Sequence, residues 1–287
     1  MWFQRARTAL ARLAFSLAIV SLTSAARAQS VDLVAAGSLN LALSQVADAF
    51  LAKTGIKVTQ TYGPSGTLRQ QIEGGLRPDV FASADTASPR ALAREGLAGP
   101  VQVFARNQIV AVVRSGFGQT VGQSNLLDVL LDPATRIGTS TPVADPLGDY
   151  TQRVFQKAHA IVPGAEATLE AKAAQLVGGN PSAPPVPTGA NSLVYFLNTQ
   201  QTVDIFISYA TSAVQARTLD PTLRIIFLPR ELSVAAPFGL TVFNGASPDG
   251  QQFADYVLSR QGQRILATYG FLPACRSPDR DPLRDGC

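Results

Sequence analysis

Short apolar runs alternate with segments of helical periodicity along almost the whole chain, and this alternation limits the folds that the sequence can adopt. The runs 31–36, 79–85 and 107–113 are rich in apolar residues and are typical of buried strands. Between them, apolar residues recur three and four positions apart, as they do over 39–50. The alternation predicts an α/β architecture of mainly parallel sheets with helices on both faces.

The second half of the chain gives three further expectations. Residues 166–177 are predicted to form one helix, and residues 248–269 a single long closing helix with a buried face. Between them, GGNPSAPPVPTGA at 178–190 is rich in proline and glycine and is predicted to be a loop.

The first 28 residues have the pattern of a secretory signal peptide. Three arginines and no acid lie within 1–12, an apolar core follows at 13–23, and Ala26-Arg27-Ala28 provides small residues for cleavage. The apolar core is shorter than the roughly 20 residues that a membrane span needs. We therefore expect residues 1–28 to be removed on export to the periplasm, the alternative being an uncleaved anchor.

The charge of the chain is concentrated in this leader. Its four arginines account for the whole formal net charge of +4, so the exported part is neutral overall. A neutral chain without a polybasic run lacks the electrostatic footprint of a nucleic-acid-binding protein. About 259 residues remain after cleavage, which is large for one core and suits two lobes.

Two cysteines, Cys275 and Cys287, lie in the C-terminal tail. Because the chain is expected to be exported, a disulfide between them is the favoured interpretation. The alternative is two unpaired thiols on a frayed tail. The pair does not indicate a metal site, since no further ligands lie near it.

Three strand-to-helix turns are rich in glycine and hydroxyl groups. AAGSLN contains Ser38, YGPSGT contains Ser65, and the stretch ending in DPLGDY places Leu147 at a helix start. Helix N-termini offer unpaired N–H groups where the dipole favours negative charge. In YGPSGT, Gly63 and Gly66 are expected to open the backbone to a ligand. Each hydroxyl alone could be an ordinary helix cap, but the set indicates an oxyanion site of neutral donors.

Signals of catalysis are sparse. The single histidine, His159, lies in a helical stretch and is interpreted as a surface residue. The nucleophile pattern G-x-S-x-G is absent, as are a phosphate-binding loop, a dinucleotide fingerprint and zinc-ligand spacing. The sequence therefore indicates binding rather than turnover, with no cofactor and no metal ion.

Four motifs resemble those of the molybdate-binding proteins of ABC importers. They are AAGSLNLALSQVADAF, YGPSGTLRQQIEGGLRPDVFASAD, DPLGDY and DIFISYATSAV, and the resemblance runs from about residue 31 to 273. It implies a type II periplasmic binding-protein fold, in which two α/β lobes close on a tetrahedral oxyanion. We expect lobe I to comprise 30–107 plus 232–287, and lobe II to comprise 108–231.

The resemblance also implies a ligand set of neutral groups. By motif, these are the hydroxyls of Ser38 and Ser65, backbone amides at Leu147 and near Asn191, and the phenol of Tyr209. GPSGT replaces the run of serines found in many relatives, so fewer hydroxyls are available.

These observations predict a periplasmic receptor, expected to be a monomer, that binds molybdate or tungstate and delivers it to an ABC permease. One alternative is a receptor of the same fold for another anion, such as sulfate or a small carboxylate. Another is a secreted hydrolase that uses Ser65 as its nucleophile, which the single histidine disfavours.

Overall fold

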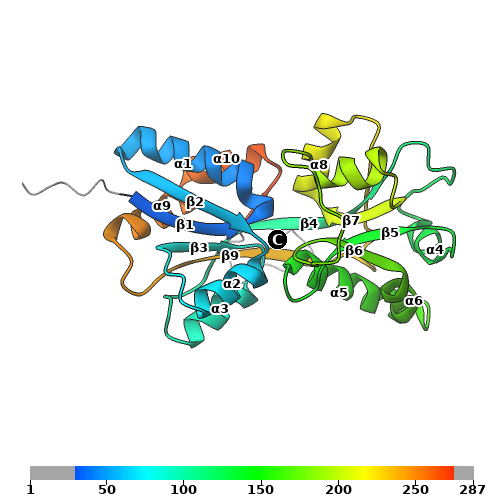
Figure 1. The fold of residues 1–287 in the computed structure, drawn as a ribbon, viewed down its shortest axis with the longest axis horizontal. Helices are drawn as coiled ribbons and strands as arrows, with labels where there is room; N and C mark the ends of the chain where they lie inside the picture. The colour runs from blue at the N-terminus through cyan, green and yellow to red at the C-terminus, as the bar shows by residue number, and fades with distance from the viewer. Residues whose placement is uncertain (1–29, 275–287) are drawn as a thin grey trace, which may run out of the picture.

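Residues 30–274 are described by a computed structural model, shown in Figure 1. The signal peptide predicted over 1–28 and the disulfide predicted between Cys275 and Cys287 lie outside these residues. No helix within 30–274 is both long enough and apolar enough to cross a membrane.

One half of the molecule, drawn in blue and cyan in Figure 1, is built on three parallel strands in the order β2-β1-β3. A helix begins within a few residues of the end of each strand, so the helix N-termini gather along one edge of the sheet. The elements are β1 (Ser30–Ala36), η1 (Gly37–Leu39), α1 (Asn40–Thr54), β2 (Lys57–Gly63), α2 (Ser65–Glu73), β3 (Val80–Ser83) and α3 (Ala87–Arg94).

The other half, drawn in green and yellow, repeats this plan with parallel strands in the order β7-β5-β6. Its short α7 continues as the π-helical turn η2. The elements are α4 (Leu126–Leu131), β5 (Ile137–Ser140), α5 (Pro146–Ile161), α6 (Ala165–Lys172), β6 (Ala173–Val177), α7 (Ser192–Val194), η2 (Tyr195–Thr199), β7 (Ile205–Tyr209) and α8 (Ala210–Leu219).

Two antiparallel strands, β4 (Gln102–Val113) and β9 (Ala235–Val242), connect the halves. The first part of β4 pairs with β9, which in turn pairs with β3. From Ile109 onward, β4 pairs instead with β7, and its last four residues also pair with β8 (Arg224–Phe227). The small strand β10 (Leu272–Pro273) returns to pair with β4 as well. A single strand thus belongs to both sheets.

The proposed lobe boundaries can be located on this framework. The division between residues 107 and 108 falls next to the point where β4 exchanges β9 for β7. The division between residues 231 and 232 falls between β8 and β9. The division of the chain into two lobes at these residues stays a prediction.

One segment that was predicted to be a single helix is a helix followed by a strand. The helix expected over 166–177 ends at Lys172 as α6, and Ala173–Val177 form β6, which pairs in parallel with β5. The prediction of one helix is wrong because backbone pairing with β5 outweighs the local helical preference of this alanine-rich run. The loop predicted over 178–190 contains no helix or strand, as expected.

The predicted closing helix is two helices, α9 (Pro248–Leu258) and α10 (Arg260–Thr268). Ser259 between them has an extended conformation, and its Oγ accepts a hydrogen bond from the Gly262 N–H at 3.3 Å. A serine that caps a new helix competes with continuation of the previous one. The expectation of one unbroken helix was therefore wrong at Ser259.

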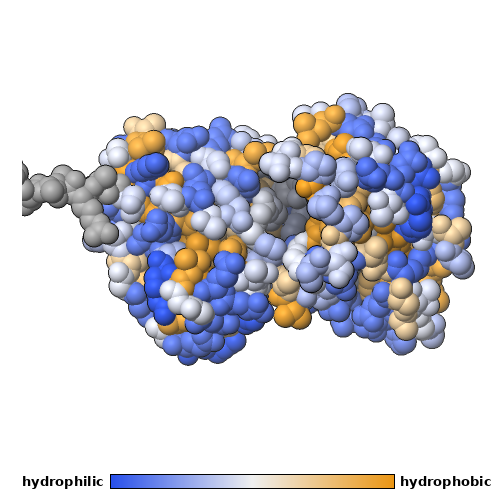
Figure 2. All heavy atoms as spheres, in the orientation of Figure 1, coloured by the Kyte–Doolittle hydropathy of each residue, from blue (hydrophilic) through white to orange (hydrophobic). Residues whose placement is uncertain are grey.

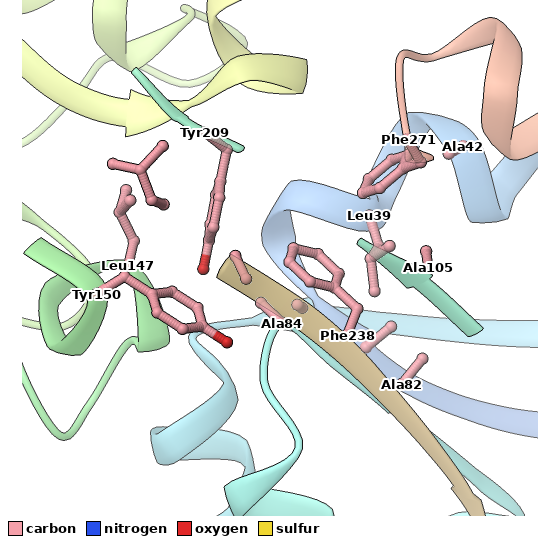
Figure 3. Packing of buried hydrophobic residues seen from close by; sticks show 14 of the residues in the cluster. Leu39, Ala42, Ala82, Ala84, Ala105, Leu147, Tyr150, Tyr209, Phe238 and Phe271 are labelled. Atoms are coloured by element: carbon pink, nitrogen blue, oxygen red, sulfur yellow. The ribbon is translucent and has the colours of Figure 1, made fainter. Parts of the chain in front are cut away.

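Aromatic side chains fill the core where the halves meet. The Tyr209 ring packs edge-on against Phe238 of β9 and Tyr150 of α5, with centroid distances of 5.4 and 6.4 Å. Phe238 also contacts Phe271 near the C-terminal end of the described chain at 5.6 Å. Figure 3 shows these rings side by side, with the Tyr209 ring extending toward Tyr150. This packing holds the Tyr209 ring in one position.

A buried ion cluster secures the start of β7. Asp204, only 3% exposed, accepts hydrogen bonds from the side chains of Arg114, next to the end of β4, and Arg136, which precedes β5. Burial alone would raise the pKa of Asp204, but the bonds from Arg136 and Arg114 outweigh it and lower the pKa to about 2. The carboxylate therefore stabilises the fold at neutral pH.

We expect Asp204→Asn to lower the free energy of unfolding by about 3 kcal/mol at neutral pH, because two arginines lose their shared counter-ion. A depressed carboxyl pKa gives stability that is present above the unfolded-state pKa and is lost as the pH falls toward about 2. The difference between wild type and variant should therefore shrink in urea denaturation below about pH 4. The exposed Asp128→Asn is the matched control. Equal stability of Asp204→Asn and wild type at pH 7 would contradict the expectation.

Candidate functional site

A cavity of about 460 Å³ lies between the two halves, at the ends of the strands where the helices begin. Figure 2 shows the hollow between the halves. All five residues predicted from the sequence belong to its lining: Ser38, Ser65, Leu147, Asn191 and Tyr209. The first two come from the β2-β1-β3 half and the other three from the β7-β5-β6 half. The fold thus brings residues 171 positions apart in sequence, Ser38 and Tyr209, into one site.

The two serines are held differently. Ser38 lies in η1 directly after β1, and its buried Oγ has no hydrogen-bond partner within the described structure. Ser65 begins α2 and is 1% exposed. Its Oγ accepts a hydrogen bond from the Ala84 N–H at 3.1 Å. Because this bond occupies an oxygen lone pair, the hydroxyl hydrogen of Ser65 remains free to donate.

The Tyr209 hydroxyl is a second buried group without a partner among the described residues. Burial raises the pKa of Tyr209 well above its usual value, and the nearby Asp145 raises it further. The phenol therefore stays protonated and can donate a hydrogen bond. A buried polar group left unpaired costs about 1–3 kcal/mol. Two such groups at one cavity indicate a site built to receive an acceptor.

The two predicted backbone donors already have side-chain caps beside them. The Leu147 N–H donates to Asp145 Oδ1 at 3.0 Å, so this amide has a partner within the protein. At α7, Asn191 Oδ1 accepts from the N–H groups of Leu193 and Val194 at 3.0 and 3.2 Å. Asn191 therefore acts as the helix cap and at the same time lines the cavity.

Sequence reasoning missed a carboxyl group in the lining, that of Asp145. Its Oδ2 accepts from Ser140 Oγ at 2.7 Å, and its Oδ1 accepts from Leu147. Burial raises the pKa of Asp145, with Asp149 and Asp85 adding to the effect. The signal available in the sequence was Asp-Pro at a helix start, a common cap followed by proline in the first turn.

Further hydroxyl and amide groups extend the cavity beyond the predicted set, and Lys and Arg do not occur among its lining residues. These additional groups belong to Asn40, Ser192, Ser208, Ser212 and Gln215. A site with neutral donors and without cations can bind an anion through dipoles alone.

Within residues 30–274, His159 and Ser65 do not belong to one site. His159 lies outside the cavity lining, and its Nδ1 accepts a hydrogen bond from the Gly164 N–H at 3.2 Å. A serine nucleophile needs an adjacent base, and no histidine accompanies Ser65 in the lining. No cluster of three or more metal-ligating side chains occurs in this part of the chain.

Comparisons with known proteins agree with a binding site. A family model of bacterial extracellular solute-binding proteins matches residues 31–272. An uncharacterized protein of Pasteurella multocida is 32% identical over 243 residues, which cover 84% of this chain and 98% of that protein. The molybdate-binding protein ModA of Mycobacterium bovis is 28% identical over 250 residues, which cover 85% of each.

Solved structures share the fold. The periplasmic molybdate-binding protein of Azotobacter vinelandii aligns with a TM-score of 0.66 at 20% identity, covering 85% of this chain and 100% of that one. The sulfate-binding protein SubI of Mycobacterium tuberculosis aligns with a TM-score of 0.68 at 18% identity, covering 86% and 88%. The predicted type II periplasmic binding-protein fold is thereby confirmed. The chain belongs to the family of bacterial extracellular solute-binding proteins, and it is a solute-binding receptor of the ABC-importer type rather than an enzyme.

Proposed function

We propose that this receptor binds a tetrahedral oxyanion, molybdate or tungstate, in the cavity between its halves. The observation that carries the proposal is the pair of buried, unpartnered hydroxyls of Ser38 and Tyr209, which line the same cavity as Ser65. The similarity to a molybdate-binding protein at 28% identity supports it. Tungstate is included in the proposal because its size and charge are nearly those of molybdate.

The chemistry of the lining suits a fully ionised anion. Removing an oxyanion from water is costly unless each oxygen finds hydrogen-bond donors. Hydroxyls of Ser38 and Ser65 approach from one half and that of Tyr209 from the other. An anion held by all three ties the halves together, so ligand binding and closure of the lobes are linked. Ser38, Ser65, Tyr209 and the backbone near Leu147 and Asn191 form the proposed ligand set. The Leu147 N–H would have to share its hydrogen between the anion and Asp145 Oδ1.

The biological setting is part of the same proposal. The receptor is exported by its signal peptide, works as a periplasmic monomer and delivers its ligand to the membrane subunits of an ABC permease. The family assignment supports this setting.

The size of the cavity keeps open the alternative of another anion, including a carboxylate with more atoms than a tetrahedral oxyanion. Four oxygen atoms at the liquid share of about 30 Å³ per water occupy about 120 Å³. The cavity volume of about 460 Å³ exceeds this several-fold. Either ordered water fills the remaining space around a tetrahedral anion, or a larger anion occupies it.

Calorimetric titration of the exported chain with molybdate, tungstate, sulfate, phosphate and a small carboxylate distinguishes these possibilities. The proposal expects saturable binding of molybdate and tungstate, with the other anions binding much more weakly. Absence of binding by both metal oxyanions would reject it. Tight binding of sulfate or the carboxylate alone would establish the alternative.

Tyr209→Phe removes only the phenolic hydroxyl and should weaken molybdate binding about tenfold, because one donor to the anion is lost. Folding stability should be equal or higher, since a buried unpaired hydroxyl disappears. Tyr256→Phe is a matched control, because Tyr256 also has a buried hydroxyl without a partner among the described residues but lies outside this cavity. Unchanged affinity in Tyr209→Phe, or equal losses in both variants, would contradict the assigned role. Calorimetry and thermal denaturation provide the two readouts.

The carboxyl of Asp145 should make binding pH-dependent. Its pKa is raised, so the carboxyl becomes ionised later than usual as the pH increases, and the resulting charge repels an anion in the cavity. Affinity should therefore fall as the pH rises through this raised pKa, and Asp145→Asn should bind about tenfold more tightly than wild type once the wild-type carboxyl is ionised. Asparagine keeps an oxygen for the Leu147 N–H. Parallel pH profiles for variant and wild type would refute this role of Asp145.

A further inference from the structure

A strained turn in the β7-β5-β6 half reaches across to the other half. The Ala144 N–H donates to the Pro142 carbonyl at 2.8 Å, which closes a three-residue turn centred on Val143. Val143 has a φ of 68°, a conformation that is rare and strained for a β-branched residue. Its side chain is 67% exposed, so burial of the side chain does not offset the strain. Such strain persists only where surrounding contacts enforce it.

Two contacts enforce this turn. Within its own half, the Val143 N–H donates to Asp149 Oδ1 at 2.8 Å, from the first turn of α5. Across the interface, the Ala144 carbonyl accepts from the N–H groups of Gly66 and Thr67 at 2.9 and 3.2 Å. These two amides are among the first of α2, which have no acceptor within their own helix. The turn therefore takes the place of an intrahelical partner.

Gly66 is what allows the turn to come so close. A Cβ at this position would overlap the carbonyl oxygen of Val143 and lie 2.9 Å from that of Ala144. The sequence-based expectation that Gly66 opens the backbone to a ligand is therefore corrected, because carbonyl groups of the opposite half occupy the space in front of it. Gly66, Val143, Ala144 and Asp149 are all absent from the cavity lining.

We propose that the turn at 142–144 holds the two halves together through the hydrogen bonds between the Ala144 carbonyl and the start of α2. We call this turn the clasp. Asp149 and Gly66 act as positioning residues, which keep the clasp in place for ligand capture. Ser65 directly precedes the two clasped amides, so closing the clasp also fixes Ser65 at the cavity. The inference rests on the proposed function for its effect on an anion. The clasp itself uses only protein groups, so the proposal expects it to form in the ligand-free protein as well.

The test compares two variants with two matched controls. Gly66→Ala adds a Cβ that prevents the clasp from approaching α2. Asp149→Asn weakens the hydrogen bond that Asp149 accepts from the Val143 N–H. Gly118→Ala places a methyl group where no atom lies within 4 Å, and Asp128→Asn changes an exposed first-turn acid of α4. Molybdate association and dissociation rates are measured by stopped-flow tyrosine fluorescence. Small-angle X-ray scattering of the ligand-free proteins measures how far the halves are open.

Gly66→Ala should raise the molybdate dissociation rate about tenfold, because the two lost hydrogen bonds exist only in the closed form. Its association rate should not fall below that of wild type, since molybdate enters the open form. Asp149→Asn should raise the dissociation rate about threefold, corresponding to one weakened bond. Without ligand, Gly66→Ala should have a larger radius of gyration than wild type. Both controls should match wild type in all three measurements.

If the clasp is absent, Gly66→Ala will match wild type in dissociation rate and in ligand-free radius of gyration, or Gly118→Ala will show the same changes. If circular dichroism shows that Gly66→Ala does not fold, the dissociation rate and the ligand-free radius of gyration of Asp149→Asn are used to test the clasp instead. Failure of the wild-type protein to bind molybdate would reject the proposed function but not the clasp. The scattering of the ligand-free proteins would still confirm or overturn the clasp.

Discussion

Backbone pairing along β4 is the constraint on which the rest of this structure depends. One strand supplies hydrogen bonds to β9 in one sheet and to β7 and β8 in the other, so the two sheets share this strand. The helices that follow β1, β2 and β7 therefore begin at a common cleft. A binding site made of helix starts and strand ends follows from this arrangement, as it does at the strand ends of other open α/β sheets.

The site combines two opposing electrostatic features. Its donors are neutral, and two of them, Ser38 and Tyr209, are kept without partners within the described structure at a cost to stability. Beside them stands a carboxyl, Asp145, whose hydrogen bonds to Ser140 and Leu147 organise the start of α5. The carboxyl serves the local structure and opposes an anion at the same time. Such a site favours ligands whose oxygens match the donors in position, since no lysine or arginine of the lining assists them.

The sequence predicts much of this architecture because strand and helix signals are local. Apolar runs identify β1 and β4, and the glycine-serine turns identify the helix starts that carry Ser38 and Ser65. The two failures have different causes. A distant contact, the pairing with β5, converts the end of a predicted helix into β6. A local contact, the cap that Ser259 provides for the Gly262 N–H, divides the other predicted helix in two. The Asp145 carboxyl and the Val143 turn could not be placed, since their meaning depends on segments far apart in the chain.

The contact between Gly66 and the 142–144 turn also constrains how this receptor can diverge. A side chain at position 66 would collide with main-chain oxygens, and no replacement of the Val143 or Ala144 side chains removes a main-chain oxygen. With the two halves in contact here, a substitution at position 66 can be accommodated only by a different path of the facing backbone. Insertions or deletions between β5 and α5 should therefore accompany the loss of this glycine among homologues, so that the length of one loop and the identity of one residue in the opposite half are inherited together.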